Sequence, residues 1–185
     1  MESDKDIINK YLAGNKDYFE ILVNKHLSHV FNFVVRYSGD REGAADLVQE
    51  TWLRVWRNLK KFDTDKKFIT WVFTIAHHVV IDWQRKKKAL TFSELDTVES
   101  DFKESLAGDL PSPEEIFDQK FLHEKFREVV EALSSLEQSI ILLHLEQNLS
   151  FIEIAEVLNK PQNTVKSIYR RALLKVKEKW PDGLR

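Results

Sequence analysis

The sequence contains no cysteine and is poor in glycine and proline. Without cysteine among its 185 residues, it has no disulfide, no nucleophilic thiol and no cysteine-ligated zinc site. No apolar run approaches the roughly 20 residues that a membrane-spanning helix needs. The opening stretch MESDKDIINK is too acidic and polar for a secretory signal. We therefore expect a cytoplasmic protein without membrane insertion.

Charge and helical periodicity are what the sequence has in quantity. Hydrophobic residues make up 43% and charged residues 31%, which is typical of a soluble globular chain of one large domain or two small ones. Only 5 glycines and 4 prolines interrupt it. Apolar residues recur at helical rather than alternating spacing, so we predict an all-α fold.

The charge is unevenly distributed along the chain. Residues 1–90 carry a net +4, residues 91–124 carry −8 and residues 125–185 carry +2. The acidic stretch is rich in Ser, Asp and Glu and lacks sustained periodicity, as expected of a tether. We predict two small helical domains, residues 1–89 and 119–185, joined by an acidic flexible linker over residues 90–118.

Three helices are predicted over residues 5–13, 17–37 and 41–59, with Asp40 as a candidate N-cap of the third. The second places these apolar residues on one face: Phe19, Leu22, Val23, Leu27, Val30, Phe31 and Val34. The third has this buried stripe: Ala44, Leu47, Val48, Thr51, Trp52 and Val55. Asp46, Gln49 and Glu50 lie off that stripe at i, i+3 and i+4, and spacing alone favours a solvated acidic ridge.

A fourth helix is predicted over residues 68–88, FITWVFTIAHHVVIDWQRKKK. Its core stripe is Phe68, Val72, Ile75, Ala76, Val79 and Trp83. A second ridge holds Trp71, His78, Asp82 and Arg85. A face largely opposite the core holds Thr70, Thr74, His77, Ile81, Gln84 and Lys88. From spacing alone, Asp82 and Arg85 fit either a helical ion pair or a functional role.

Helices are also predicted over residues 119–133 and 136–145, followed by a sharper pattern over residues 149–180. Ser135 with Gln138 and Ser150 with Glu153 each fit a capping box. Ser150 would begin a short helix that turns at NKPQ, where Asn159 tolerates a left-handed conformation. The short helix would bury Phe151, Ile154, Ala155 and Leu158, and the next one Val165, Tyr169, Ala172 and Val176. We interpret this pattern as a helix-turn-helix.

The second helix of this pattern has a polar and basic outer face. Short polar side chains near its start suit base edges in the major groove, and arginines suit phosphates or guanine. The candidate DNA-binding residues are Asn163, Thr164, Lys166, Ser167, Arg170, Arg171 and Lys175.

Metal and enzyme chemistry lack support in the sequence. The adjacent His77 and His78 diverge by about 100° on a helix, so they cannot share a zinc ion. His26 and His29 could share a ligand but have no evident partners. There is no glycine-rich phosphate loop and no nucleophile elbow. We expect neither catalysis nor a cofactor.

Two separate motifs resemble bacterial sigma factors. ADLVQETWLRVWRNLKKF (residues 45–62) with FITWVFTIAHHVVIDWQRKKK is similar to sigma region 2, and LSFIEIAEVLNKPQNTVKSIYRRALLKVKEKW (residues 149–180) is similar to region 4. Their order and the acidic linker resemble the extracytoplasmic-function (ECF) subfamily of the sigma-70 family. The resemblance implies a promoter-specificity subunit of RNA polymerase, with a region 2 helical bundle and a region 4 helix-turn-helix.

The resemblance also implies roles for residues and partners. Region 2 would dock on the β′ coiled coil of core polymerase through Asp46, Gln49, Glu50, Arg54 and Trp56. It would bind melted -10 DNA through Phe62, Asp63, Lys66, Lys67, Trp71, His77, His78, Arg85, Lys86 and Lys88. Region 4 would read the -35 element and meet the β flap. The linker would thread near the polymerase active-centre cleft, and an anti-sigma factor is an expected partner.

Some positions depart from the family pattern. His77 and His78 stand where many members have Arg-Asn, and Asn163 and Ile168 replace a frequent Gly and Arg. Asn159 replaces a frequent Gly at the turn. These departures predict an altered promoter preference. The alternatives are a stand-alone helix-turn-helix regulator, although the N-terminal half lacks the strand pattern of a receiver domain, and a module that sequesters a sigma factor, which would not need two DNA-reading surfaces.

Overall fold

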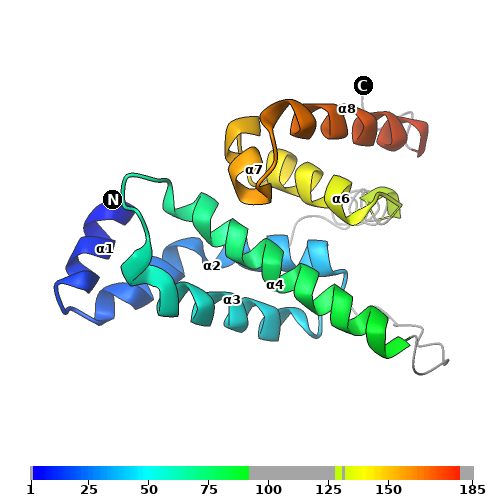
Figure 1. Ribbon diagram of the computed structural model, residues 1–185. Helices are drawn as coiled ribbons and strands as arrows, with labels where there is room; N and C mark the ends of the chain where they lie inside the picture. The colour runs from blue at the N-terminus through cyan, green and yellow to red at the C-terminus, as the bar shows by residue number, and fades with distance from the viewer. Residues whose placement is uncertain (1, 92–127, 131, 180–185) are drawn as a thin grey trace, which may run out of the picture.

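The computed structural model describes residues 2–91, 128–130 and 132–179, which form helices and connecting turns without a strand. The first group contains α1 (Asp4–Leu12), α2 (Asp17–Ser38), α3 (Ala44–Asn58), a 3₁₀ turn η1 (Leu59–Lys61) and α4 (Phe68–Thr91). In Figure 1, α2, α3 and α4 run beside one another and α1 closes one end of the bundle. The predicted all-α class is confirmed.

The second group of helices lies over α2 and α4 in Figure 1. It contains α6 (Ser135–Ile141), a π-helical turn η2 (Leu142–Glu146), α7 (Phe151–Leu158) and α8 (Gln162–Lys179). Residues 128–130 are also helical. Most of the helix predicted over residues 119–133, and the predicted linker, lie outside the described residues.

Local capping signals explain where several helices begin and end. The Ser150 hydroxyl accepts from the Glu153 N–H while the Glu153 carboxylate accepts from the Ser150 N–H, so this predicted capping box is confirmed. The other predicted box is wrong by one residue: the pair is Ser134 with Glu137. Asn159 ends α7 in the left-handed region with φ 48°, as predicted.

The start of α3 differs from the prediction by three residues. Asp40 does not cap the helix directly; its Oδ1 accepts from the Gly43 N–H at 2.9 Å, which stabilises a turn before Ala44. Gly39 adopts φ 68° at the end of α2, a conformation that glycine takes at little cost. The glycine and the aspartate together separate α2 from α3.

The core of the first domain agrees with the predicted stripe of α3, whose six residues are all buried. The predicted face of α2 is partly wrong, because Leu27 and Phe31 are each 39% exposed. Instead, the interior side of α2 includes His26, Phe33 and Tyr37. Phe33 and Tyr37 point toward a second partner that the periodicity of α2 alone does not reveal, the C-terminal domain.

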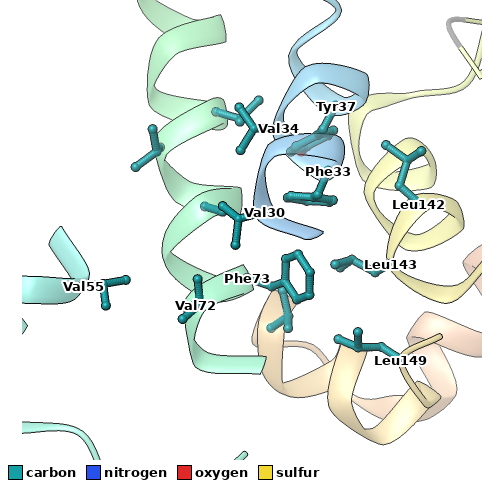
Figure 2. Close-up of a cluster of buried hydrophobic side chains, with 14 of the residues drawn as sticks. Val30, Phe33, Val34, Tyr37, Val55, Val72, Phe73, Leu142, Leu143 and Leu149 are labelled. Carbon is teal, nitrogen blue, oxygen red and sulfur yellow. The ribbon is translucent and has the colours of Figure 1, made fainter. Parts of the chain in front are cut away.

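The two domains share one hydrophobic core. Figure 2 shows Phe33 and Phe73 of the first domain beside Leu143 and Leu149 of the second. The Phe33 and Phe73 rings meet edge to face with centroids 5.3 Å apart, a favoured aromatic geometry. All four side chains are at most 2% exposed. The C-terminal domain therefore packs on the bundle as part of the same buried cluster.

Candidate polymerase and DNA interfaces

The outer side of α3 carries the predicted polymerase-binding ridge. Asp46 and Gln49 are exposed, and Glu50 is half-buried. Leu53 and Trp56 are 39% and 52% exposed on the same helix. Leu53 is not among the residues predicted for this ridge. Its spacing could have indicated it, because it is an apolar residue that lies off the core stripe, four residues after Gln49. The ridge therefore combines polar groups with two apolar side chains.

Arg54 links this ridge to α4. Its Nε donates to Glu50 Oε1 at 2.7 Å and its Nη1 lies 3.3 Å from Asp82 Oδ2. The hydrogen bond to Glu50 is the largest contribution that raises the pKa of Arg54. Asp82 therefore pairs across helices with Arg54, and not along α4 with Arg85 as the spacing allowed. Arg54 fixes the position of Glu50 and is less available to a partner.

The segment before α4 carries part of the predicted -10 surface. Asp63 and Lys66 are exposed, whereas Phe62 is buried, with ring centroids 5.5 Å from Phe68 and 4.8 Å from Trp71. Phe62 therefore supports the core in this structure and does not present a free ring to a base. Trp71 is half-buried beside it, with part of its surface available.

His77 was expected on a face of α4 largely opposite the core, but it is half-buried where the two domains meet. Its ring stacks on Tyr37 with centroids 5.3 Å apart and planes 10° apart. Burial lowers the pKa of His77 to about 4, assisted by the neighbouring His78 and Lys160. It is therefore neutral at pH 7. His78 on the adjacent ridge is exposed.

Other residues of the same α4 face are also covered. Thr70 is buried, and Gln84 donates to the Tyr37 carbonyl at 3.1 Å and accepts from the Ser135 hydroxyl at 3.2 Å. At the start of α4, Lys67 pairs with Glu153 of α7 at 2.7 Å. The far end of the helix is open, where Arg85, Lys86 and Lys88 are exposed.

The C-terminal helix-turn-helix is built as predicted. Its core includes Ile154, Val165 and Ala172, and an aromatic group of His144, Phe151 and Tyr169 supports it, with His144 stacked 4.4 Å from Phe151. Tyr169, expected in the core, is only half-buried. Its place on the inner face of α8 is taken by Ile168, which is 6% exposed.

The exposed side of α8 gathers most of the predicted -35 residues. Asn163, Thr164, Ser167, Arg170 and Arg171 are exposed, and Lys166 is half-buried. Lys175 is exposed too, but its Nζ lies 2.8 Å from Glu137 Oε1. Because Ile168 packs inward, its difference from the frequent arginine concerns the core of the domain and not a direct contact with DNA.

The described residues offer no cluster that suits a metal ion: within residues 2–91, 128–130 and 132–179, no three His, Cys, Asp or Glu side chains gather in that way. His26 bonds Asp4, with Nε2 and Oδ1 3.0 Å apart, while His29 bonds Gln147. These two histidines therefore face different partners. No helix in the described part of the chain has the length and apolar character to cross a membrane.

An all-α chain with an exposed basic helix-turn-helix is typical of a DNA-binding protein. Comparisons with known proteins identify the family to which it belongs. Residues 22–90 match Sigma-70 region 2 and residues 123–176 match Sigma-70, region 4. The ECF RNA polymerase sigma factor SigX of Bacillus subtilis is 30% identical over 161 residues, covering 85% of this chain and 81% of SigX. The RNA polymerase sigma factor YlaC of the same organism is 29% identical over 164 residues, covering 89% of this chain and 92% of YlaC.

A solved structure agrees on the fold. The sigma factor RpoE in complex with the anti-sigma factor NepR, from Bartonella quintana, has a TM-score of 0.73 at 22% identity and covers 89% of this chain and 98% of that chain. The protein thus belongs to the sigma-70 family, in its ECF subfamily. It is a promoter-specificity factor for transcription initiation; the alternative of a stand-alone regulator is not favoured.

Proposed function

We propose that this sigma factor uses three separate surfaces: α3 to join core RNA polymerase, the start of α4 with its preceding loop to bind the -10 element, and α8 to read the -35 element. The observation that carries the proposal is the exposed polar and basic side of α8 in a helix-turn-helix whose first helix, α7, is capped at both ends. It occurs in a chain whose other domain matches Sigma-70 region 2.

The α3 ridge suits a protein partner. Asp46 and Gln49 supply exposed hydrogen-bonding groups, and Leu53 and Trp56 supply exposed apolar area. Interfaces combine polar groups with a few apolar or aromatic side chains that supply most of the affinity. We propose that this ridge docks on the β′ coiled coil, with Arg54 holding Glu50 in position.

The α8 surface suits a major groove. Asn163, Thr164 and Ser167 occupy the first two turns, where side chains of a recognition helix reach base edges. Arg170 and Arg171 follow one turn later, where they can pair with phosphates or guanine. The nearby β flap of the polymerase would hold this domain over the -35 element.

The -10 surface suits single-stranded DNA only in part while the domains are packed. Trp71 offers an aromatic face, and Arg85, Lys86 and Lys88 offer cations for the backbone. We further propose that the protein acts in the cytoplasm, has no catalytic activity of its own and is bound by an anti-sigma factor. The last point is supported by the similarity to a sigma factor whose structure was solved with NepR.

Reconstitution with core polymerase tests the proposal. The purified chain should join core enzyme and initiate transcription from a subset of promoters in a genomic fragment library. Asp46→Ala with Gln49→Ala should lower core affinity while the helical fold is kept. Glu178→Ala, which removes an exposed carboxylate from the end of α8, is the control and should bind core normally. Unchanged core affinity in the double variant would remove α3 as the docking surface.

A second pair of variants tests the DNA surface. Arg170→Ala with Arg171→Ala should weaken -35 binding and lower the salt dependence of binding, by about one unit of slope for each phosphate that the variant no longer neutralises. Core association should stay intact, which separates this surface from α3. DNA binding at full strength would contradict the assignment of α8.

A further inference from the structure

The C-terminal half of α8 is joined to the start of α6. The two helices run side by side in Figure 1. Ala172 and Val176 of α8 are buried in one cluster with Ile141 of α6. Lys175 lies between them in the sequence, and its ammonium group reaches Glu137 in the first turn of α6. This half of α8 therefore has a fixed neighbour, whereas the polar side of its first half is open to solvent.

Glu137 accepts hydrogen bonds from both helices through one carboxylate. Its Oε2 accepts from the Ser134 N–H at 2.9 Å and from the Ser134 hydroxyl at 2.8 Å, which completes the capping box of α6. Lys175 Nζ donates to Oε1 at 2.8 Å and to Oε2 at 2.9 Å. Glu137 is 7% exposed, and a charged group that is withdrawn from water needs such donors. The carboxylate is therefore held in one place.

The pair between Glu137 and Lys175 matters more to the glutamate than to the lysine. Burial disfavours the charged carboxylate, but the hydrogen bonds from Lys175 and Ser134 outweigh burial and lower the pKa of Glu137. The Glu137 side chain is 9% exposed, whereas the Lys175 side chain is 52% exposed. Water can solvate the lysine without its partner, but the glutamate without Lys175 would be a buried charge lacking a cation.

Lys175 lies far from the residues that are proposed to read bases. At a rise of about 1.5 Å per residue, it lies about 18 Å along the axis from Asn163, whereas the major groove is about 12 Å wide. It follows Ser167 and Arg171 at intervals of four residues, so the three side chains form one ridge of α8. A contact that fixes Lys175 therefore fixes the rotation of α8 about its axis, and with it the directions of Ser167 and Arg171.

We propose that Glu137 and Lys175 are positioning residues for -35 recognition: their pair sets the rotation of α8, and Lys175 does not itself neutralise a DNA phosphate. The inference rests on the proposed reading of the -35 element by α8. It assigns Lys175 a role different from the one expected from the sequence, where it was grouped with the DNA-binding residues. Side chains that are already oriented before binding lose less freedom when they bind.

Glu137→Gln separates the two roles of Lys175 because they predict opposite results. Glutamine still suits a capping box, so α6 keeps its start while the charged pair is lost. The probe is a duplex that carries the -35 element of a promoter found by reconstitution and ends before its -10 element. The variant, in complex with core polymerase, should bind this duplex several-fold more weakly and discriminate less against a changed -35 sequence. Stronger binding would show that the freed Lys175 contacts phosphate, and would overturn the proposal.

The salt dependence of binding provides an independent measurement. Lys175→Gln should lower affinity and sequence discrimination as Glu137→Gln does, without changing the slope of log affinity against log salt. A decrease of about one unit in this slope would instead reveal a phosphate contact. Lys175→Arg keeps a cation for Glu137 and should bind like the parent chain. Lys177→Gln is the matched control: it removes an exposed cation from the same half of α8 and should leave affinity and discrimination unchanged.

A double variant tests whether the two residues act as a pair. Glu137→Gln with Lys175→Gln should lose no more affinity than either single change, because each change already breaks the same contact. Losses that add together would contradict the pairing. The variant Arg170→Ala with Arg171→Ala separates this inference from the proposed function. If it alone weakens -35 binding, α8 keeps its role and the positioning pair is refuted; if it also binds normally, reading by α8 is refuted as well.

Discussion

The burial of His77 makes stability depend on pH in a predictable direction. Burial lowers the pKa of His77 from 6.5 to about 4 in the native state, so the unfolded chain binds more protons than the native chain between those values. The free energy of unfolding therefore falls as the pH falls from near neutrality toward about 4. Linkage gives a loss of about 2 kcal/mol between about pH 7.5 and about pH 5 from this one group.

His77→Phe isolates that contribution, because phenylalanine keeps a ring against Tyr37 and does not titrate. The measurement is the free energy of unfolding in urea at the two pH values, for the parent chain and the variant. The parent should lose about 2 kcal/mol more than His77→Phe. His78→Phe is the matched control: His78 is an exposed neighbour, so this variant should follow the parent. A parent-to-variant difference that does not change with pH would show that His77 is not buried at the domain contact.

Three further predictions concern stability and binding. Phe73→Ala should lower the free energy of unfolding, measured by urea denaturation, by about 3–5 kcal/mol because Phe73 is 1% exposed in the shared core. A much smaller decrease would contradict its burial there. Ser134→Ala should lower the free energy of unfolding by about 1 kcal/mol because it removes the cap of α6. Ser135→Ala leaves this cap intact and is the control. Amide hydrogen exchange at the start of α6 should be faster in Ser134→Ala than in Ser135→Ala. Trp56→Ala should leave the melting temperature nearly unchanged because the side chain is 52% exposed, yet weaken binding to core polymerase, and an unchanged affinity would exclude Trp56 from the interface.

Features set by local chemistry could be predicted from the sequence. The six-residue stripe of α3 follows from helical periodicity within one bundle, and Ser150 with Glu153 follows from the needs of a helix start. Asn159 is left-handed because the turn before α8 requires it. The capping box of α6 was misplaced because two adjacent serines, Ser134 and Ser135, each have a suitable residue three positions later, Glu137 or Gln138.

Features set by contact between domains could not be predicted in the same way. Periodicity divides a helix into faces but does not tell how many of them are covered. α4 has one side against α2 and α3 and another against α7, so His77 and Thr70 are covered on a face that looked free. The same reason explains α2, where Phe33 and Tyr37 serve the second domain while Leu27 and Phe31 remain exposed.

The helix formed by α6 and η2 has a practical consequence for dissecting the protein. Its four consecutive residues Ile140, Ile141, Leu142 and Leu143 are all 0% exposed, so this helix is covered on every side, partly by the N-terminal bundle. A fragment cut within the linker would leave part of that apolar surface open to water, and surfaces of this kind promote aggregation. We therefore expect the C-terminal half to be poorly soluble when produced alone, and to become soluble when it is produced together with the N-terminal half.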